Sequence, residues 1–98
     1  MSVCEVNIHG DKYWYDNSYG YHRLDGPAIE FASGNKCWYQ NNELHRLDGP
    51  AVEYSDGSEH WYQNGERHRV DGPAAEYSNG HKSWYLNGEK IISNFMME

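Results

Sequence analysis

Short runs of alternating apolar and polar residues, each followed by a turn signal, recur along this chain. The clearest run, Ala51–Ser55, alternates and leads into the Asp-Gly pair at 56–57, and a second run over residues 58–63 leads into Asn-Gly at 64–65. A period of two is typical of a half-buried strand, and Asp-Gly or Asn-Gly between two such runs is the strongest short hairpin signal. The pattern predicts two β-hairpins in this stretch.

A third short strand is expected over residues 66–69, before Asp71-Gly72-Pro73 ends the ladder, because proline lacks a donor and restricts the residue before it. Outside the C-terminal residues no helical period is present. The predicted fold is therefore all-β, a single-layer antiparallel meander of hairpins with about three strands per unit.

The whole unit occurs three times, over residues 22–44, 45–67 and 68–90, with 12 of its 23 positions identical in all three copies. Each copy opens His-Arg-(Leu/Val)-Asp-Gly-Pro-Ala and closes Trp-Tyr-x-Asn-x-Glu. Repeats of this length stack on one another to bury a shared surface. We expect an N-terminal strand and partial repeat over 1–21, three repeats over 22–90, and an apolar segment over 91–98.

Two-residue turns would set Val52 opposite Trp61, and Trp61 opposite His68. At the front, a two-residue turn at His9-Gly10 would put Glu5 opposite Trp14, and a three-residue turn would put Val6 there. In every copy one face would then carry the tryptophans and the other the tyrosines. The tryptophan face holds Trp14, Trp38, Trp61 and Trp84, and the tyrosine face holds Tyr15, Tyr39, Tyr62 and Tyr85.

A single layer leaves one aromatic face with nothing in the repeats to cover it, and large exposed apolar patches mark interaction sites. The apolar C-terminal segment would either cap the last repeat or dock on a second copy, giving a homodimer. Its candidate contact residues are Ile91, Ile92, Phe95 and Met96.

The net charge of the chain bears on the kind of partner that it would bind. Fifteen Asp and Glu against eight Lys and Arg give a net charge of −7. Such a surface disfavours direct nucleic-acid binding through phosphate neutralisation, and it suits a protein partner with a basic surface. Glu53, Asp56 and Glu59 are the candidates for contact with such a partner.

Histidine and aspartate recur in each copy, at His22, His45 and His68 and at Asp25, Asp48 and Asp71. Three strands per copy at about 4.8 Å would place equivalent histidines roughly 14 Å apart, too far to share a zinc ion with nitrogen ligands at about 2 Å. We expect each His to pack against a Trp and each Asp to accept bonds from the Gly-Pro turn backbone. No metal or other cofactor is predicted.

Two interpretations of the recurring arginines remain open. Arg23, Arg46 and Arg69 could form a ladder with Glu30, Glu53 and Glu76 between neighbouring repeats. They could instead grip a carboxylate or phosphate and, with the tryptophans, bind a nucleotide. A residue present three times is not typical of a single catalytic centre. Cys37 and His60 hold equivalent places in adjacent copies, but no nucleophile, base and acid can be assembled, so no enzyme is predicted.

The period, the paired hairpins and the skeleton of Trp61, Asn64, Gly65, Gly72 and Gly80 resemble MORN repeats and the MORN-like repeats of bacterial antitoxin components. The match covers roughly residues 10–90. Unlike a typical MORN repeat, these copies have Ala28, Ala51 and Ala74 in place of a second glycine, each preceded by proline. The form with His-Arg-x-Asp-Gly-Pro-Ala in every copy is similar to small proteins of phages and giant viruses.

From this resemblance we expect a non-enzymatic protein-interaction module, such as a small phage-type inhibitor of a host defence protein, for example a CRISPR effector. The alternatives are a nucleotide-binding sponge and an antitoxin-like or structural repeat protein. No apolar run is long enough for a membrane span or a signal peptide. We therefore expect a cytoplasmic protein, in the host cytoplasm if it is viral.

Overall fold

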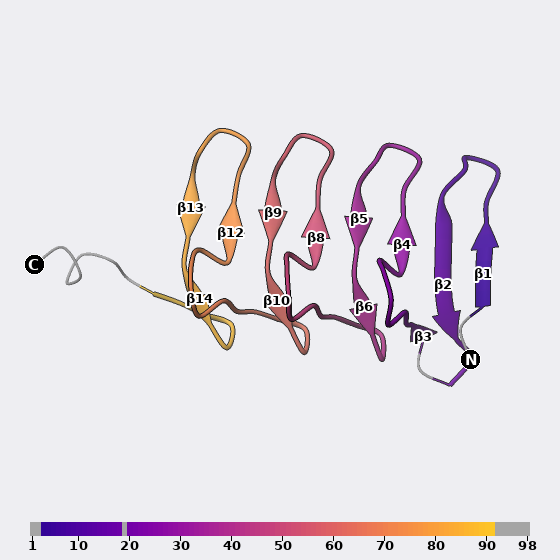
Figure 1. Ribbon diagram of the computed structural model, residues 1–98, viewed down its shortest axis with the longest axis horizontal. Coiled ribbons are helices and arrows are strands. Elements are labelled where there is room, and N and C mark those ends of the chain that lie inside the picture. Colours follow the sequence, from indigo (N-terminus) through magenta and orange to yellow (C-terminus); the bar gives the residue numbers. More distant parts are fainter. Residues whose placement is uncertain (1–2, 19, 92–98) are drawn as a thin grey trace, which may run out of the picture.

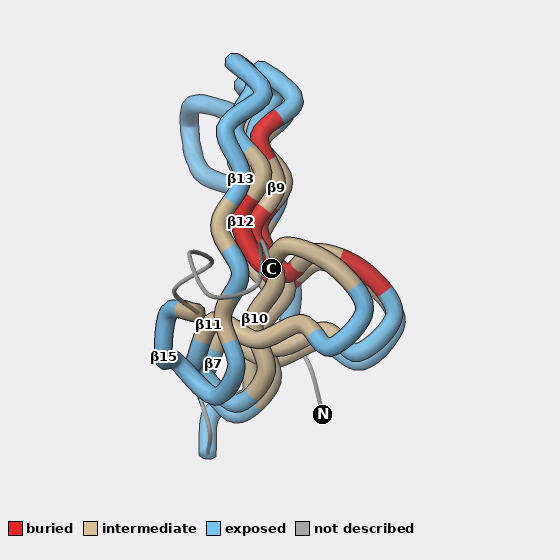
Figure 2. The backbone as a smooth tube through the Cα atoms, turned by 90° about the vertical axis from the view of Figure 1, so that its left-hand side faces the viewer, coloured by how far each residue is buried: buried red, intermediate tan, exposed pale blue. Residues whose placement is uncertain are grey.

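The computed structural model describes residues 3–18 and 20–91, and every helix or strand within them is a β-strand. The strands form hairpins that stand side by side in one row (Figure 1). Seen from the end of the row, the upper hairpins superpose as one thin layer (Figure 2). The predicted all-β, single-layer antiparallel meander is confirmed.

The upper hairpins make one antiparallel sheet, and its strands follow the order of the sequence. Along the row they are β1 (Val3–Val6), β2 (Lys12–Asp16), β4 (Ile29–Glu30), β5 (Lys36–Cys37), β8 (Val52–Glu53), β9 (Glu59–His60), β12 (Ala75–Glu76) and β13 (Lys82–Ser83). The short β3 (Gly20–Tyr21) also pairs with β2.

The lower hairpins are separate two-stranded units, one per copy. They are β6–β7 (Tyr39–Gln40 and Glu43–Leu44), β10–β11 (Tyr62–Gln63 and Glu66–Arg67) and β14–β15 (Tyr85–Leu86 and Glu89–Lys90). Each copy thus adds two strands to the main sheet, not three. At about 4.8 Å per strand, equivalent residues lie roughly 10 Å apart, and the expected 14 Å was wrong.

The lower turns have the predicted register. Tyr62 pairs with Arg67, and the His68 N–H donates to the Trp61 carbonyl at 3.0 Å. Asn64 (φ 52°) and Gly65 (φ 82°) both have left-handed backbone, which a two-residue type I′ turn requires. Asn tolerates this conformation better than other residues with a Cβ. The predicted two-residue turn at Asn64-Gly65 is confirmed.

The upper turns have a different register from the predicted one. Val52 pairs with His60, not with Trp61, because the loop contains three residues. At its mouth the Tyr54 N–H donates to the Ser58 carbonyl, and only Gly57 (φ 96°) is left-handed. The Asp56 carboxylate accepts the Ser58 N–H at 2.8 Å, which favours a type I turn followed by a glycine bulge. The shift of one residue moves Val52 to the tyrosine face.

The N-terminal hairpin follows the same rule. Cys4 pairs with Trp14, so neither Glu5 nor Val6 takes the place opposite this tryptophan. The Asn7 side chain accepts N–H bonds from His9 and from Asp11, at 2.9 and 3.0 Å, and shapes a three-residue loop. A side-chain acceptor at the start of the loop thus sets the register here too.

The core is thin and consists of small side chains. Ala28, Ala51 and Ala74 have no exposed surface, and no large side chain is fully buried among the described residues. Each of these alanines accepts, through its carbonyl, the N–H of the preceding copy's tryptophan, at 2.6–2.7 Å. The alanine that stands where a typical MORN repeat has glycine is therefore fully enclosed in each copy.

Side chains also join neighbouring copies at the top of the hairpins and hold the turns at the bottom. At the top, the Ser55 N–H donates to Asn35 Oδ1 at 2.7 Å, and the Ser78 N–H to Ser58 Oγ at 3.0 Å. At the bottom, His45 Nδ1 accepts the Asn64 N–H at 3.0 Å, and the other two copies repeat this bond. The histidine thus satisfies a backbone donor in the turn of its own copy, while the Gly65 N–H of the same turn donates to the Leu44 carbonyl of the preceding copy at 2.9 Å.

We expect Gly57→Ala to lower the free energy of unfolding by about 1–2 kcal/mol, because a left-handed residue with a Cβ is strained. No other atom lies within 4 Å of the added Cβ, so the cost is confined to the backbone. Ala32→Ser is the matched control, since the other copies have serine there. Denaturant unfolding should separate the two variants, and an unchanged midpoint for Gly57→Ala would argue against the three-residue loop.

Candidate functional site: the boundary loops

Each copy begins with a loop that connects a lower hairpin to the next upper hairpin. We call residues 22–27, 45–50 and 68–73 the boundary loops. They stand out on one side of the sheet in the end-on view (Figure 2). Each loop places its arginine over the tryptophan of the preceding copy, with the guanidinium carbon 3.8–3.9 Å from the ring centroid. The pairs are Arg23 on Trp14, Arg46 on Trp38 and Arg69 on Trp61.

The Arg46 guanidinium makes three hydrogen bonds to its own boundary loop and to the strand that follows it. Its Nε donates to Asp48 at 3.2 Å, and NH1 donates to the Pro50 carbonyl at 3.0 Å and to Glu53 at 3.1 Å. A Cβ added to Gly49 would lie 2.7 Å from the guanidinium carbon, so the glycine backbone packs closely against it. The guanidinium is therefore enclosed between an indole ring and a glycine.

The other two copies repeat this arrangement. Arg23 bonds Asp25, the Pro27 carbonyl and Glu30, and Arg69 bonds Asp71, the Pro73 carbonyl and Glu76. The arginine–glutamate ladder exists, but each pair lies within one copy, not between neighbours as expected. Each aspartate pairs with its own copy's arginine, where we had predicted bonds from the turn backbone.

The tryptophan face is consequently not bare. An arginine covers each of the first three indoles, and the expectation of an uncovered aromatic stripe was wrong for them. Trp84 is the exception and is 41 % exposed. The position equivalent to the covering arginine is Ile92 in the sequence, and it lies outside the described residues together with Phe95 and Met96. Ile91 is described, and its N–H donates to the Trp84 carbonyl at 2.8 Å.

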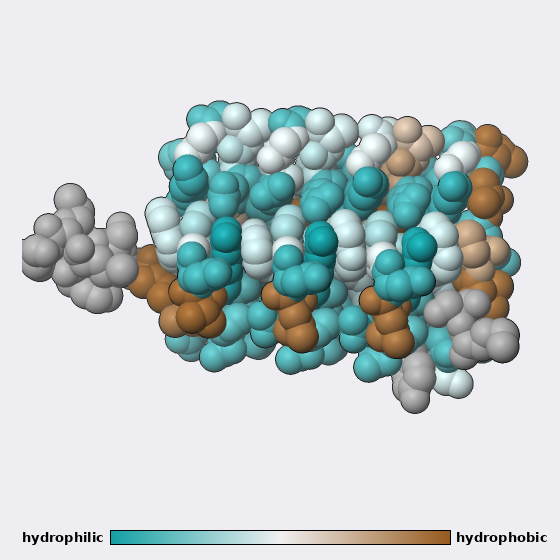
Figure 3. All heavy atoms as spheres, viewed as in Figure 1, coloured by the Kyte–Doolittle hydropathy of each residue, from teal (hydrophilic) through white to brown (hydrophobic). Residues whose placement is uncertain are grey.

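The loops instead present one aliphatic residue each, next to the stacked arginine. Leu24, Leu47 and Val70 are 74, 70 and 82 % exposed. On this face hydrophobic atoms gather in clusters that repeat along the row, beside hydrophilic ones (Figure 3). Sequence reasoning missed these residues. The available signal was an aliphatic residue at the same place in every copy, between Arg and Asp, in a segment that is not a strand.

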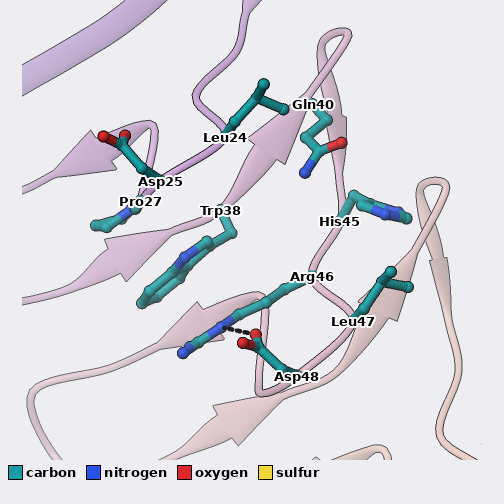
Figure 4. A pocket seen from close by; sticks show the side chains of 10 residues that line it. Leu24, Asp25, Pro27, Trp38, Gln40, His45, Arg46, Leu47 and Asp48 are labelled. Atoms are coloured by element: carbon teal, nitrogen blue, oxygen red, sulfur yellow. Dashed lines mark hydrogen bonds and ion pairs between the residues drawn. The ribbon is translucent and has the colours of Figure 1, made fainter.

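A groove of about 600 Å³ separates the first two boundary loops. Leu24 and Pro27 line one side and Leu47 the other, with Trp38 and Gln40 between them (Figure 4). In this view the Trp38 ring lies between Pro27 and the Arg46 side chain. The face is thus a series of aliphatic ridges with an aromatic floor between them.

The three acidic residues expected to contact a basic partner, Glu53, Asp56 and Glu59, lie outside the boundary loops. Glu53 is bound to Arg46, and Asp56 lies in an upper turn. Glu59 pairs in register with Glu53 on one side and Glu76 on the other, so three carboxylates stand in a row. Loop aspartates Asp25, Asp48 and Asp71 are far more exposed, at 84–89 % of the side chain.

No group of three or more His, Cys, Asp or Glu side chains in the described part of the chain could hold a metal ion. Residues 3–18 and 20–91 also contain no helix long and apolar enough to cross a membrane. Both Cys4 and Cys37 are free thiols. Val52 lies between Cys37 and His60 in the sheet, so the two side chains do not form a pair.

The chain matches no family model, no curated protein and no solved structure. The likeness to MORN repeats therefore remains a resemblance.

We expect Arg46→Ala to lower the free energy of unfolding by about 2 kcal/mol, since it removes a stacked cation and charge-assisted hydrogen bonds, of which those to Glu53 and the Pro50 carbonyl are partly shielded from water. Arg46→Lys should recover less than half of this loss, because an ammonium group lacks the planar fork. Lys36→Ala, an exposed cation in the neighbouring strand β5, should change stability by no more than about 0.5 kcal/mol. Equal effects of Arg46→Ala and Lys36→Ala in urea unfolding would contradict the role of the stack.

Proposed function

We propose that this protein is a non-enzymatic interaction module that binds a protein partner through its boundary loops. The observation that carries the proposal is the exposure of Leu24, Leu47 and Val70, each at 70 % or more, at equivalent places in three loops. Burying one such side chain in an interface contributes up to about 1.5–3 kcal/mol. Left in water, these side chains add nothing to the stability of the fold.

The loops suit binding because they are already ordered. Each is tied down by a stacked arginine with bonds to an aspartate, a carbonyl and a glutamate. Pre-ordered contact residues lose little conformational entropy when a partner docks. The spacing of roughly 10 Å per copy matches every third residue of an extended chain, or every seventh of a helix. A regular segment of the partner could therefore engage successive ridges.

The charge of this face defines the partner further. An exposed aspartate follows each aliphatic residue, as in Leu24-Asp25, Leu47-Asp48 and Val70-Asp71. With a net charge of −7, the protein would steer toward a basic surface. The expected partner surface combines apolar side chains with Lys or Arg. Nucleic-acid-binding proteins carry such surfaces.

The likeness to small phage proteins supports a more specific form of the proposal. The protein would act as an inhibitor that occupies the basic nucleic-acid groove of a host defence protein, such as a CRISPR effector. In this role the exposed carboxylates would stand in for phosphates, and the aliphatic ridges would supply contacts that nucleic acid lacks.

The combined variant Leu24→Ser, Leu47→Ser, Val70→Ser should keep wild-type stability and lose partner binding by at least about tenfold. The control is Val6→Ser, Ile8→Ser, which removes two other exposed aliphatic residues, 59 and 95 % exposed, from the N-terminal hairpin. A partner captured from bacterial lysate would be identified by mass spectrometry and its affinity measured by calorimetry. Unchanged binding by the loop variant, or an equal loss in the control, would contradict the proposal.

A separate variant tests the charge. Asp25→Asn, Asp48→Asn, Asp71→Asn keeps an acceptor for each arginine but removes three exposed charges. The association rate with the captured partner should fall several-fold at low salt and converge on the wild-type rate at high salt. Stopped-flow measurements over a salt series would show this, and a rate that is independent of these charges would exclude electrostatic steering by the loops.

A further inference from the structure

The tyrosine face of the middle copy holds a cluster that the other copies lack. His60, Arg67, Tyr54 and Tyr77 surround a pocket of about 380 Å³, whose rim includes Asp56 and Ser58. At the His60 position the other copies have Cys37 and Ser83, and at the Arg67 position they have Leu44 and Lys90. The repeat itself does not require a histidine or an arginine here.

His60 forms the floor of this pocket and is only 7 % exposed. The rings of Tyr54 and Tyr77 stand edge-on to its imidazole, at centroid distances of 5.7 and 5.2 Å and interplanar angles of 86° and 81°. Both tyrosines are partly exposed, at 44 and 39 %. The pocket therefore has aromatic walls that are open to solvent and a buried polar floor.

Arg67 supplies the positive charge. It lies between the rings of Tyr62 and Tyr85, at 5.8 and 5.3 Å, and its NH1 donates to the Tyr85 hydroxyl at 3.4 Å. Its NH2 is 3.4 Å from His60 Nδ1. These contacts are long, and none of them is to a carboxylate.

Arg67 differs from the boundary-loop arginines in having no acidic partner in the part of the chain that the structure describes. Arg23, Arg46 and Arg69 each pair with two carboxylates, whereas Arg67 has no carboxylate within 4.0 Å among the described residues. Its Nε is buried without a hydrogen-bond partner. A partly buried cation with an unpaired donor is costly in a folded protein unless a counter-charge binds.

The pKa of His60 agrees with this geometry. Burial, and then the charge of Arg67, hold it below its usual value, and Asp56 opposes the shift. Burial and the neighbouring guanidinium thus favour the neutral imidazole in the free protein. A bound anion would counter the charge of Arg67 and favour the protonated imidazole, which would make His60 a second cationic donor.

We propose that this pocket binds a small oxyanion, a phosphoryl or carboxylate group, with Arg67 as the principal donor, His60 as the second, and Tyr54 and Tyr77 as walls. Guanidinium groups recognise both anions through paired N–H donors. The volume suits a ligand at the small end of the usual range. Asp56 at the rim would repel a second negative charge, so the pocket favours a single anionic group over a polyanion.

The test is a titration of the 98-residue chain with inorganic phosphate, phenyl phosphate and benzoate. Calorimetry would give the affinities, and the NMR signals of the His60 ring would locate the binding. We expect a saturable shift of these signals and a rise in the His60 pKa. Tighter binding of phenyl phosphate than of phosphate would indicate a ligand with an aromatic body, and equal binding would indicate the free ion.

The repeats offer matched variants. Arg67→Leu and His60→Ser install residues that the fold already holds at the equivalent positions Leu44 and Ser83. Arg67→Leu should weaken anion binding by at least about tenfold, and His60→Ser by less. Lys90→Leu, which removes the exposed cation at the same place in the next copy, should leave the affinity unchanged.

Two results would overturn the proposal: no saturable response to any of the three anions, or an equal loss in Arg67→Leu and Lys90→Leu. The latter would indicate diffuse attraction by surface charge. The outcome is independent of the boundary loops, because the Leu24, Leu47 and Val70 variant should bind the anions as the wild-type protein does.

Discussion

A guanidinium enclosed between the indole of one copy and a glycine of the next is the interaction on which this architecture depends. The sheet is one layer thick, its buried apolar residues are alanine, valine and isoleucine, and none of its large side chains is fully buried in the described residues. Such a layer cannot rest on a deep core. The stack of Arg46 on Trp38, with its equivalents, covers the aromatic surface and ties each boundary loop to the preceding copy. It also fixes the loops that carry the exposed aliphatic residues.

The sequence predicted the class of fold and the register of the lower turns but not of the upper ones, and the two turn types show why. Asn64-Gly65 forms the expected two-residue turn because both residues adopt left-handed backbone. Asp56-Gly57 does not, because the Asp56 side chain accepts the N–H two residues on and leaves only the glycine left-handed. Dipeptide statistics do not separate these outcomes, yet one residue of register decides which face Val52 lies on. With Val52 opposite His60, it is the boundary-loop arginines that cover the tryptophans.

The sequence predicted which residues make up the tryptophan and arginine site, but not how their side chains contact one another. The repeat singled out the tryptophans and arginines, and the structure brings them together, but as partners of one another. Only the path of the loop shows that an arginine eight residues after Trp38 returns to stack on it. Leu24 could have been recognised, since an aliphatic residue in a proline-containing loop has no strand partner. The pocket around His60 required the register of β8, β9 and β12, although a comparison of the copies already marks His60 and Arg67 as departures from the repeat.

A double-mutant cycle between Trp38 and Arg46 tests the central claim most directly. Unfolding free energies of the wild-type protein, Trp38→Leu, Arg46→Leu and the double variant would isolate the energy that the two side chains share. We predict a coupling of about 1–2 kcal/mol that persists at high salt, as for a cation stacked on an indole and shielded from water. Additive effects of the two substitutions would contradict the account and leave the association of neighbouring copies to their hydrogen bonds.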